Sequence, residues 1–167
     1  VVTSGKGGVG KTTTTANLGA GLAKLDKKVV VIDTDLGLRN LDVVMGLENH
    51  IIYNIVDVIE GNCRLHQAII KDRKHSNLYL LPSAQSKDKD AINPNQMVNL
   101  VEKLKTQYDY ILIDCPPALS LLTINALTAA NTVLIPIQCE YYALEGLNQV
   151  LKTVGLVHKK LNPNLET

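Results

Sequence analysis

The chain has 167 residues and a nearly balanced charge, with 17 Lys and Arg against 16 Asp and Glu and a formal net charge of +1. This length fits one ordinary domain, and the charge balance argues against a broadly basic surface for nucleic acid, while leaving a local basic patch open. The 46% hydrophobic content is mostly aliphatic, because Trp and Phe are absent and only 6 Tyr occur, so aromatic platforms for stacked bases are not expected.

Short β-branched runs alternate along the chain with longer segments of helical periodicity, which is typical of βαβ units that build a parallel sheet. Strands are predicted at residues 1–3, 28–33, 78–81, 110–114 and 132–138. Each run is apolar without alternation, so each strand is expected to be buried on both faces.

Three helices are predicted between and after these strands. The first follows a glycine-rich stretch and carries leucines 18, 22 and 25 on one face. The second begins at Asn93 as N-cap with Pro94 in its first turn and runs to about residue 107. The last carries leucines 144, 147 and 151 with Val154 on one face and ends near residue 162, before Pro163.

The stretch GKGGVGKT, residues 5–12, fits the phosphate-loop pattern G-x-x-x-x-G-K-[ST] between a predicted strand and a predicted helix. Glycines allow the backbone N–H groups to turn around an anion, and the helix adds its positive end. Lys11 is expected to reach the β and γ phosphates of a nucleotide, and the Thr12 hydroxyl to bind Mg²⁺. The predicted nucleotide-binding residues are Gly5, Lys6, Gly7, Gly8, Val9, Gly10, Lys11, Thr12 and Thr13.

Three aspartates follow predicted buried strands. Asp114 ends the run ILID and is expected to support magnesium, while Asp33 and Asp35 follow the run VVVID. Because parallel strands present their carboxyl ends to one crevice, all three should face the phosphates. One of Asp33 and Asp35 can support the metal and the other can orient the attacking water, but spacing leaves this division open, and helix capping or a turn is the alternative for each.

The cysteines and the hydropathy pattern point to the cytoplasm. Cys63, Cys115 and Cys139 are widely spaced and form no metal-ligand pattern, so three reduced thiols are expected. No apolar run approaches the roughly 18 residues that span a bilayer, and the first residues, VVTSGKGG, do not form a signal peptide.

The string KGGVGKTT, with two lysines, together with IDTDLGLRNLD, resembles the deviant Walker A ATPases of the MinD and ParA family. The resemblance implies that Lys6 contacts the phosphates bound by the partner subunit of an ATP-sandwiched dimer, much as an arginine finger does. It also implies that Asp35 positions water. Lys6, Lys11 and Asp35 are then catalytic, Thr12, Asp33 and Asp114 serve the metal, and ATP and Mg²⁺ are the cofactors.

Within this family, residues 1–114 are similar to MinD and residues 115–167 to ParA or Soj. A natural fusion, an engineered chimera and an assembly artefact all remain open as explanations. No repeat or linker divides the chain, so one P-loop ATPase domain over 1–167 is expected. Its fold class is α/β, a three-layer P-loop NTPase type with a mostly parallel sheet flanked by helices, expected to be incomplete because the family's C-terminal part is missing.

The resemblance implies Mg-dependent ATP hydrolysis that drives a dimerisation switch for placing the division site, with a ParA-like or Soj-like chromosome or plasmid partitioning ATPase as the alternative. A non-enzymatic fragment and an iron–sulfur redox ATPase are the less favoured hypotheses. The second is less favoured because Cys115 and Cys139 do not have the cysteine arrangement with which such ATPases bind their cluster. The expected partners are a second copy and an activator, either MinE-like or MinC-like or else ParB-like. Membrane or nonspecific DNA would be reached only through the missing C-terminal part, at the membrane or the nucleoid.

Overall fold

The computed structural model describes residues 1–38, 40–85, 92–139 and 141–166, without the side chains of 141–145, which include predicted position 144. Its elements in chain order are α1 (Lys11–Lys24), β1 (Val29–Asp33), α2 (Asn40–Met45), the 3-10 helix η1 (Glu48–His50), α3 (Ile55–Glu60), α4 (Leu65–Ala68), β2 (Ile70–Lys71), β3 (Leu78–Leu81), α5 (Pro94–Lys105), β4 (Tyr110–Asp114), α6 (Leu121–Ala129) and α7 (Tyr141–Lys160). None of these described helices is long and apolar enough to cross a membrane.

The strands form one mostly parallel sheet in the order β2-β3-β1-β4. Strand β1 lies in the middle, parallel to β3 on one side and to β4 on the other, and every residue of β1 is buried. Only β2 runs antiparallel, next to β3. The predicted α/β class and the three strands at 28–33, 78–81 and 110–114 are therefore confirmed. The prediction that each strand is buried throughout is wrong for β4, where Tyr110 is 43% exposed and only Ile113 and Asp114 are buried.

The two outer predicted strands, 1–3 and 132–138, are wrong as regular strands. Val2 forms single parallel bridges to Asp114 and Leu134, and Thr132 forms one to Glu166. The ladder stays this short because the chain turns into the glycine loop directly after Ser4, and Pro136 has no amide to donate. Residues 1–3 still lie beside β4, with the Val2 amide donating to the Ile113 carbonyl at 2.8 Å, and residues 132–134 lie on their other side, with the Thr3 amide donating to the Leu134 carbonyl at 3.1 Å.

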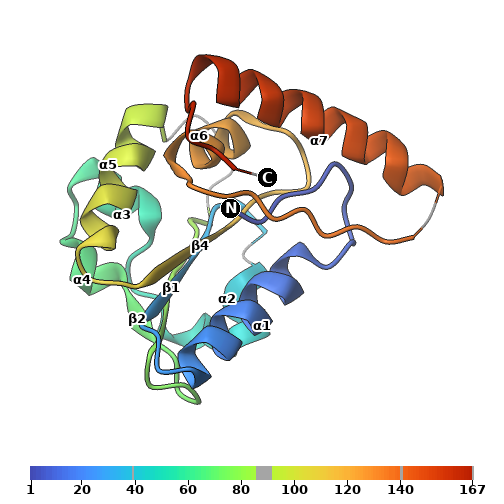
Figure 1. Cartoon of the computed structure of the whole chain (residues 1–167). Coiled ribbons are helices and arrows are strands. Elements are labelled where there is room, and N and C mark those ends of the chain that lie inside the picture. Colours follow the sequence, from blue (N-terminus) through green and yellow to red (C-terminus); the bar gives the residue numbers. More distant parts are fainter. Residues whose placement is uncertain (39, 86–91, 140, 167) are drawn as a thin grey trace.

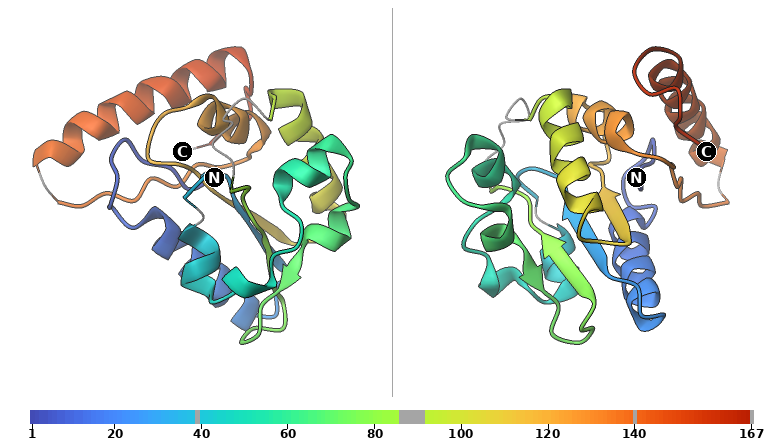
Figure 2. Two further views of the ribbon diagram at one scale, coloured as in Figure 1. Left: turned by 180° about the vertical axis from the view of Figure 1, so that it is seen from behind. Right: turned by 60° about the vertical axis from the view of Figure 1, so that its left-hand side comes forward.

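Helices cover both faces of the sheet and give three layers (Figures 1 and 2). One core cluster joins α1 and α2 to Val29 and Val31 of β1, and the other joins α5 and α6 to Val30 and Ile32. Successive residues of β1 thus point to opposite cores, as the pleat requires. Helix α7 packs outside α6, with Val150, Val154 and Val157 buried together with Leu127.

Helix α1 buries small residues rather than the leucines expected from the sequence. Leu18 is 38% exposed and Leu25 71% exposed, and of the three leucines Leu22 is partly buried against the core. The buried face is instead formed by Lys11, Thr15, Ala16, Gly19 and Ala23. The cause is close packing, because a Cβ on Gly19 would lie 3.0 Å from both the Leu78 Cδ1 and Val31 Cγ1 atoms. The predicted helix is confirmed, but its predicted face is wrong for Leu18 and Leu25.

The other two predicted helices are confirmed with small shifts at their ends. Asn93 caps α5 in a capping box with Gln96, and Pro94 occupies its first position, as expected. Helix α5 ends at Lys105 and α7 at Lys160, each two residues before the predicted end. In α7, Val154 is buried as predicted but Leu151 is 45% exposed.

The close approach of α1 to the sheet predicts opposite effects for two glycines of this helix. Gly19→Val should lower the free energy of unfolding by about 1–3 kcal/mol, because the added methyl groups overpack the contact with Leu78 and Val31. Gly21→Ala should raise it by about 0.5–1 kcal/mol, since the side chain would enter open space. Urea denaturation measures both, and equal stability of Gly19→Val and the wild type would contradict the packing argument.

Candidate nucleotide site

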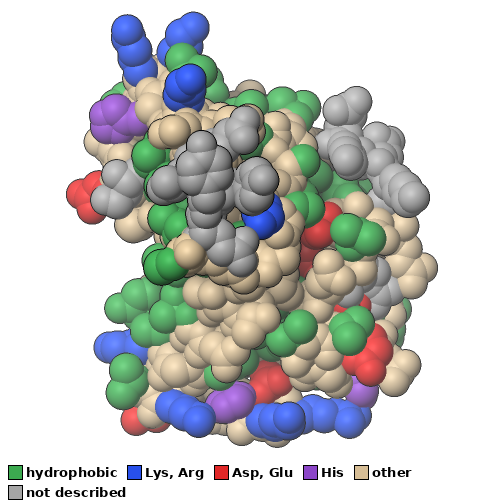
Figure 3. Space-filling view, turned by 90° about the vertical axis from the view of Figure 1, so that its right-hand side faces the viewer, with side chains coloured by type: hydrophobic (Ala, Val, Ile, Leu, Met, Phe, Trp, Pro, Cys, Tyr) green, Lys and Arg blue, Asp and Glu red, His purple; other side chains and the backbone are tan. Residues whose placement is uncertain are grey.

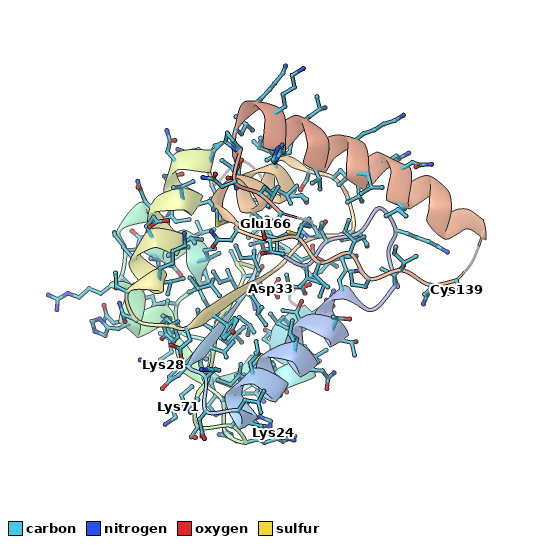
Figure 4. The ribbon with its side chains drawn as sticks, in the orientation of Figure 1. Lys24, Lys28, Asp33, Lys71, Cys139 and Glu166 are labelled. Atoms are coloured by element: carbon cyan, nitrogen blue, oxygen red, sulfur yellow. The ribbon has the colours of Figure 1, made fainter. Side chains whose placement is uncertain are left out.

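The predicted site residues meet at the carboxyl ends of β1 and β4. These strands are paired in parallel register with Asp33 opposite Asp114, and Asp33 lies near the centre of the molecule (Figure 4). The glycine loop follows directly after the Val2 bridge to Asp114 and leads into α1. The topology therefore brings the loop and the acids of two strands to one edge of the sheet, which is the usual ligand position in open α/β folds.

The loop has the backbone of a phosphate cradle. Gly8 and Gly10 have φ angles of 77° and 89°, values that a residue with a side chain rarely adopts. No side chain caps the start of α1, and no acidic residue lies in its first turn, so the first-turn amides and the positive end of the helix are left for an anion. The predicted residues 5–13 thus form one continuous loop and helix start.

Lys11 is buried inside this loop, with 6% of its surface exposed. Its Nζ atom donates to the Ser4 hydroxyl oxygen at 3.0 Å and to the Lys6 carbonyl oxygen at 3.2 Å. Burial lowers the pKa of Lys11, while the carboxylates of Asp114 and Asp35 act to raise it. The ammonium group is therefore placed beside two carboxylates and held by groups of the loop itself.

Asp114 accepts hydrogen bonds from the first two turns of α1. The Thr15 hydroxyl donates to its Oδ1 atom at 3.2 Å, and the Thr12 side chain is a further hydrogen-bond partner. Burial raises the pKa of Asp114 to about 6, against the opposing effects of these hydrogen bonds and of Lys11. The predicted pair Thr12 and Asp114 is thus brought together, and Asp114 is held between β4 and α1.

Asp33 and Asp35 have different environments. Asp33 is 1% exposed, and its carboxylate accepts from the Asp35 amide at 2.8 Å and from the Leu41 amide at 3.3 Å. Burial raises the pKa of Asp33 to about 7, although these backbone hydrogen bonds oppose the shift. Asp35 is only half-buried. Asp33 therefore fixes the backbone that carries Asp35, and Asp35 is the more accessible carboxylate.

The residues present fit a magnesium–nucleotide complex. Among the described residues, no three His, Cys, Asp or Glu side chains converge closely enough to hold a metal by themselves. Magnesium does not need such a cage, because it is usually bound through one or two carboxylates together with water and substrate phosphates. Thr12 and Asp114 supply hard oxygen atoms at the end of the glycine loop.

Several residues of the site were not predicted from the sequence. The Ser4 hydroxyl accepts a hydrogen bond from Lys11, and the Thr15 hydroxyl donates one to the Asp114 carboxylate. The Thr34 hydroxyl donates to the Asp114 carbonyl oxygen at 2.7 Å. The Gln138 side chain donates to the Gly8 carbonyl oxygen at 3.4 Å. The run of four threonines after Lys11 was a visible signal for Thr15, one helical turn later, whereas nothing in the sequence indicates Gln138.

The raised pKa of Asp114 predicts a gain in stability for Asp114→Asn in the absence of ligand. Its pKa is 3.8 in the unfolded reference and about 6 in the folded protein, so the ionised group disfavours folding above this range. Its favourable contribution is complete below about pH 4 and is lost as the pH rises through about 6. At pH 8, Asp114→Asn should raise the free energy of unfolding by about 1–3 kcal/mol.

Urea denaturation at pH 5 and pH 8 measures this effect, with Asp26→Asn as the control. Asp26 is exposed and has a φ of 58°, which asparagine tolerates. The wild type should lose stability between the two pH values, and Asp114→Asn should lose less. A variant less stable than the wild type at pH 8 would show that the hydrogen bonds of the carboxylate outweigh its burial.

Comparison with known proteins extends the similarity over the whole chain. A family described as AAA domain matches residues 1–167. The septum site-determining protein MinD of Bacillus subtilis (strain 168) is 50% identical over 163 residues, which cover 97% of this chain and 60% of that protein. MinD of Synechocystis sp. is 53% identical over 173 residues, covering 99% of this chain and 65% of that protein. The chain therefore spans less than two thirds of these relatives.

Solved structures share the fold at similar coverage. The MinC:MinD cell division protein complex of Aquifex aeolicus matches with a TM-score of 0.83 and 41% identity, covering 98% of this chain and 64% of that chain. MinD of Pyrococcus horikoshii OT3, complexed with Mg-ADP, matches with a TM-score of 0.82 and 33% identity, covering 98% and 65%. Cobyrinic acid a,c-diamide synthase of Mycobacterium smegmatis, with bound ADP and magnesium, matches with a TM-score of 0.86 and 30% identity, covering 99% and 69%.

The MinD matches extend well past residue 114, so the similarity to MinD is not confined to the first part of the chain. These matches, together with the glycine loop and the nearby aspartates, identify the family of the chain. It belongs to the AAA domain family and, within it, to the P-loop ATPases of the MinD and ParA type.

Proposed function

We propose that the chain binds Mg-ATP and hydrolyses it as a nucleotide-dependent dimerisation switch for placing the division site. The observation that carries this proposal is the buried Lys11 inside a glycine loop that faces the carboxylates of Asp35 and Asp114. A merely structural turn would not need a desolvated cation at this point, because burying a charge costs free energy that a bound anion repays.

Thr12, Thr13 and the loop from Gly5 are proposed to bind the phosphates, with Lys11 exchanging its bonds to Ser4 and Lys6 for bonds to phosphate oxygens. Thr12 and Asp114 would hold Mg²⁺, with Asp33 supporting them from beside Asp114 in the sheet. Bound Mg²⁺ would neutralise negative charge on the β and γ phosphates. The protein's contribution is to fix these oxygen atoms before the ligand arrives.

Lys6 and Asp35 are proposed to act on hydrolysis. Asp35 is the more accessible carboxylate, and its backbone is fixed by hydrogen bonds to Asp33 and Ser83, so it can orient a water molecule. Lys6 lies in the loop on the N-terminal side of the cradle and would contact the phosphates bound by a second copy. A cation supplied in this way couples hydrolysis to dimerisation.

The MinD relatives favour division-site placement over the ParA-like partitioning alternative, because proteins named as septum site-determining MinD match nearly the whole chain at 50% identity and above. A MinC-like partner is supported by the Aquifex complex of MinC with MinD. An activator resembling MinE, and a cytoplasmic location with recruitment to the membrane, are further parts of this proposal. The activator and the location are properties of a whole protein, and this chain covers 60–65% of the length of these relatives.

Calorimetric titration with Mg-ATP, followed on the same sample by sedimentation with a slowly hydrolysed ATP analogue, tests the proposal. Binding together with a shift from monomer to dimer is the expected result. Binding of Mg-ATP without dimer formation would support nucleotide binding but contradict the proposed dimerisation switch. A folded sample that binds no nucleotide would refute the proposed function of this chain.

A further inference from the structure

The backbone of the glycine loop touches the backbone of α7 at a pair of glycines. Gly5 and Gly146 are far apart in sequence, yet a Cβ atom added to Gly5 would lie 2.1 Å from the Gly146 carbonyl oxygen and 2.7 Å from its Cα atom. A Cβ added to Gly146 would lie 3.2 Å from the carbonyl carbon and oxygen of Gly5. In Figures 1 and 2 the loop before α1 rises toward α7. The contact has no room for a side chain on Gly5.

The segment that leads into α7 adds further contacts to the same loop. The Gln138 side chain donates to the Gly8 carbonyl oxygen at 3.4 Å. The cavity between loop and helix, lined on the α7 side by Ile135, Pro136, Ile137, Gly146 and Leu147, measures only about 10 Å³. This volume is at the lower limit of what one buried water needs, so at most one water molecule fits between the loop and this segment.

Gly5 differs in this respect from the other glycines of the loop. Gly8 and Gly10 have positive φ and no atom within 4 Å of an added Cβ, and the nearest atom for Gly7 is the Pro117 Cβ at 3.7 Å. Those positions are shaped by backbone conformation and by the space left for a ligand. At Gly5, it is instead the contact with Gly146 that excludes a side chain.

We propose that Gly146 is a positioning residue for the phosphate loop. By its contact with Gly5, it fixes the peptide that joins Gly5 to Lys6 and thereby the position of the Lys6 Cα atom. The carbonyl oxygen of Lys6, in the next peptide, accepts from the Ser4 hydroxyl at 2.7 Å and from the Lys11 ammonium at 3.2 Å. A shift of the Lys6 Cα atom therefore moves both this anchor of Lys11 and the start of the Lys6 side chain. This inference rests on the proposed function, because it assigns Gly146 to the nucleotide site.

A size series at position 146 tests the proposal, with position 155 as the matched control. Gly155 lies in the same helix, is exposed, and has open space around an added Cβ. Gly146→Ala should weaken Mg-ADP binding by less than about tenfold, because a Cβ at 3.2 Å from the Gly5 carbonyl shifts the loop by only a few tenths of an ångström. Gly146→Val should weaken it by about a hundredfold, since its larger side chain must displace the loop by about 1 Å. Gly155→Ala should stay within about twofold of the wild type, and both alanine variants should keep or raise the melting temperature because alanine favours the helix.

Hydrogen exchange of the nucleotide-free proteins gives a second readout that does not depend on binding. Exchange of the loop amides at residues 6–10 should become faster in Gly146→Val and stay unchanged in Gly155→Val. Unchanged loop exchange and unchanged Mg-ADP affinity in Gly146→Val would overturn the proposal. If the wild type binds no Mg-ADP, the proposed function fails, and faster loop exchange in Gly146→Val alone would still support the positioning role.

Discussion

Lys11→Ala is expected to weaken Mg-ATP binding by about 3 kcal/mol or more, a hundredfold or greater increase in Kd. The Lys11 ammonium is buried, is placed by Ser4 and the Lys6 carbonyl, and lies near the carboxylates of Asp35 and Asp114. Removing it takes away the strongest positive charge available to the phosphates. It also removes a cation that offsets the two carboxylates, so the bound nucleotide would meet more negative charge.

Calorimetric titration measures this effect, and two further variants are compared with Lys11→Ala. Lys11→Met keeps a buried apolar stem and separates the loss of charge from a loss of packing. Lys24→Ala removes an exposed lysine from the last turn of the same helix and should leave affinity unchanged. An unaltered Kd for both Lys11 variants would mean that the phosphates bind elsewhere.

Lys6→Ala should retain Mg-ATP binding but slow hydrolysis by about a thousandfold, the lower range for loss of a cation that acts across a subunit boundary. The reason is geometric, because the proposed contact of Lys6 is with the phosphates of the partner subunit and forms only in the dimer. Steady-state turnover per subunit, measured beside calorimetric affinity, separates this result from a simple loss of binding.

Mixing Lys6→Ala with Asp35→Ala tests the proposed action in trans. In a mixed dimer, the site of the Lys6→Ala subunit keeps its own Asp35 and receives the partner's lysine, while the other site lacks both groups. An equal mixture should therefore regain about a quarter of wild-type turnover, since half of the dimers are mixed and each has one complete site. No recovery in the mixture, or wild-type turnover by Lys6→Ala alone, would refute the trans role.

The features that could be predicted from the sequence are those whose signal lies in neighbouring residues. The central strands are continuous apolar runs, and the glycine loop, the Asn93 cap and the acids that end β1 and β4 are each carried by neighbouring residues. The order of parallel strands then brings these acids together without further information. For this reason the predicted phosphate loop and acids form one site in the structure.

The failures concern contacts between distant segments. The leucine spacing in α1 suggested an apolar face, but the sheet selects Ala16 and Gly19 because the helix approaches Val31 and Leu78 closely. The contact of Gly5 with Gly146 likewise has no local signal, since a glycine inside a long helix reads only as a weak helix former. Single bridges replaced the predicted outer strands because Pro136 and the glycine loop interrupt pairing.

The small residues on the buried face of α1 also bear on how fast a ligand can bind. They let the helix lie directly on β1 and β3, so the loop at its N-terminus is preorganised and loses little conformational entropy when an anion arrives. The hydrogen bonds of Lys11 to Ser4 and Lys6 must then be exchanged for bonds to phosphate oxygens. We therefore expect nucleotide association to occur in one fast phase, with little of the binding free energy spent on ordering the loop.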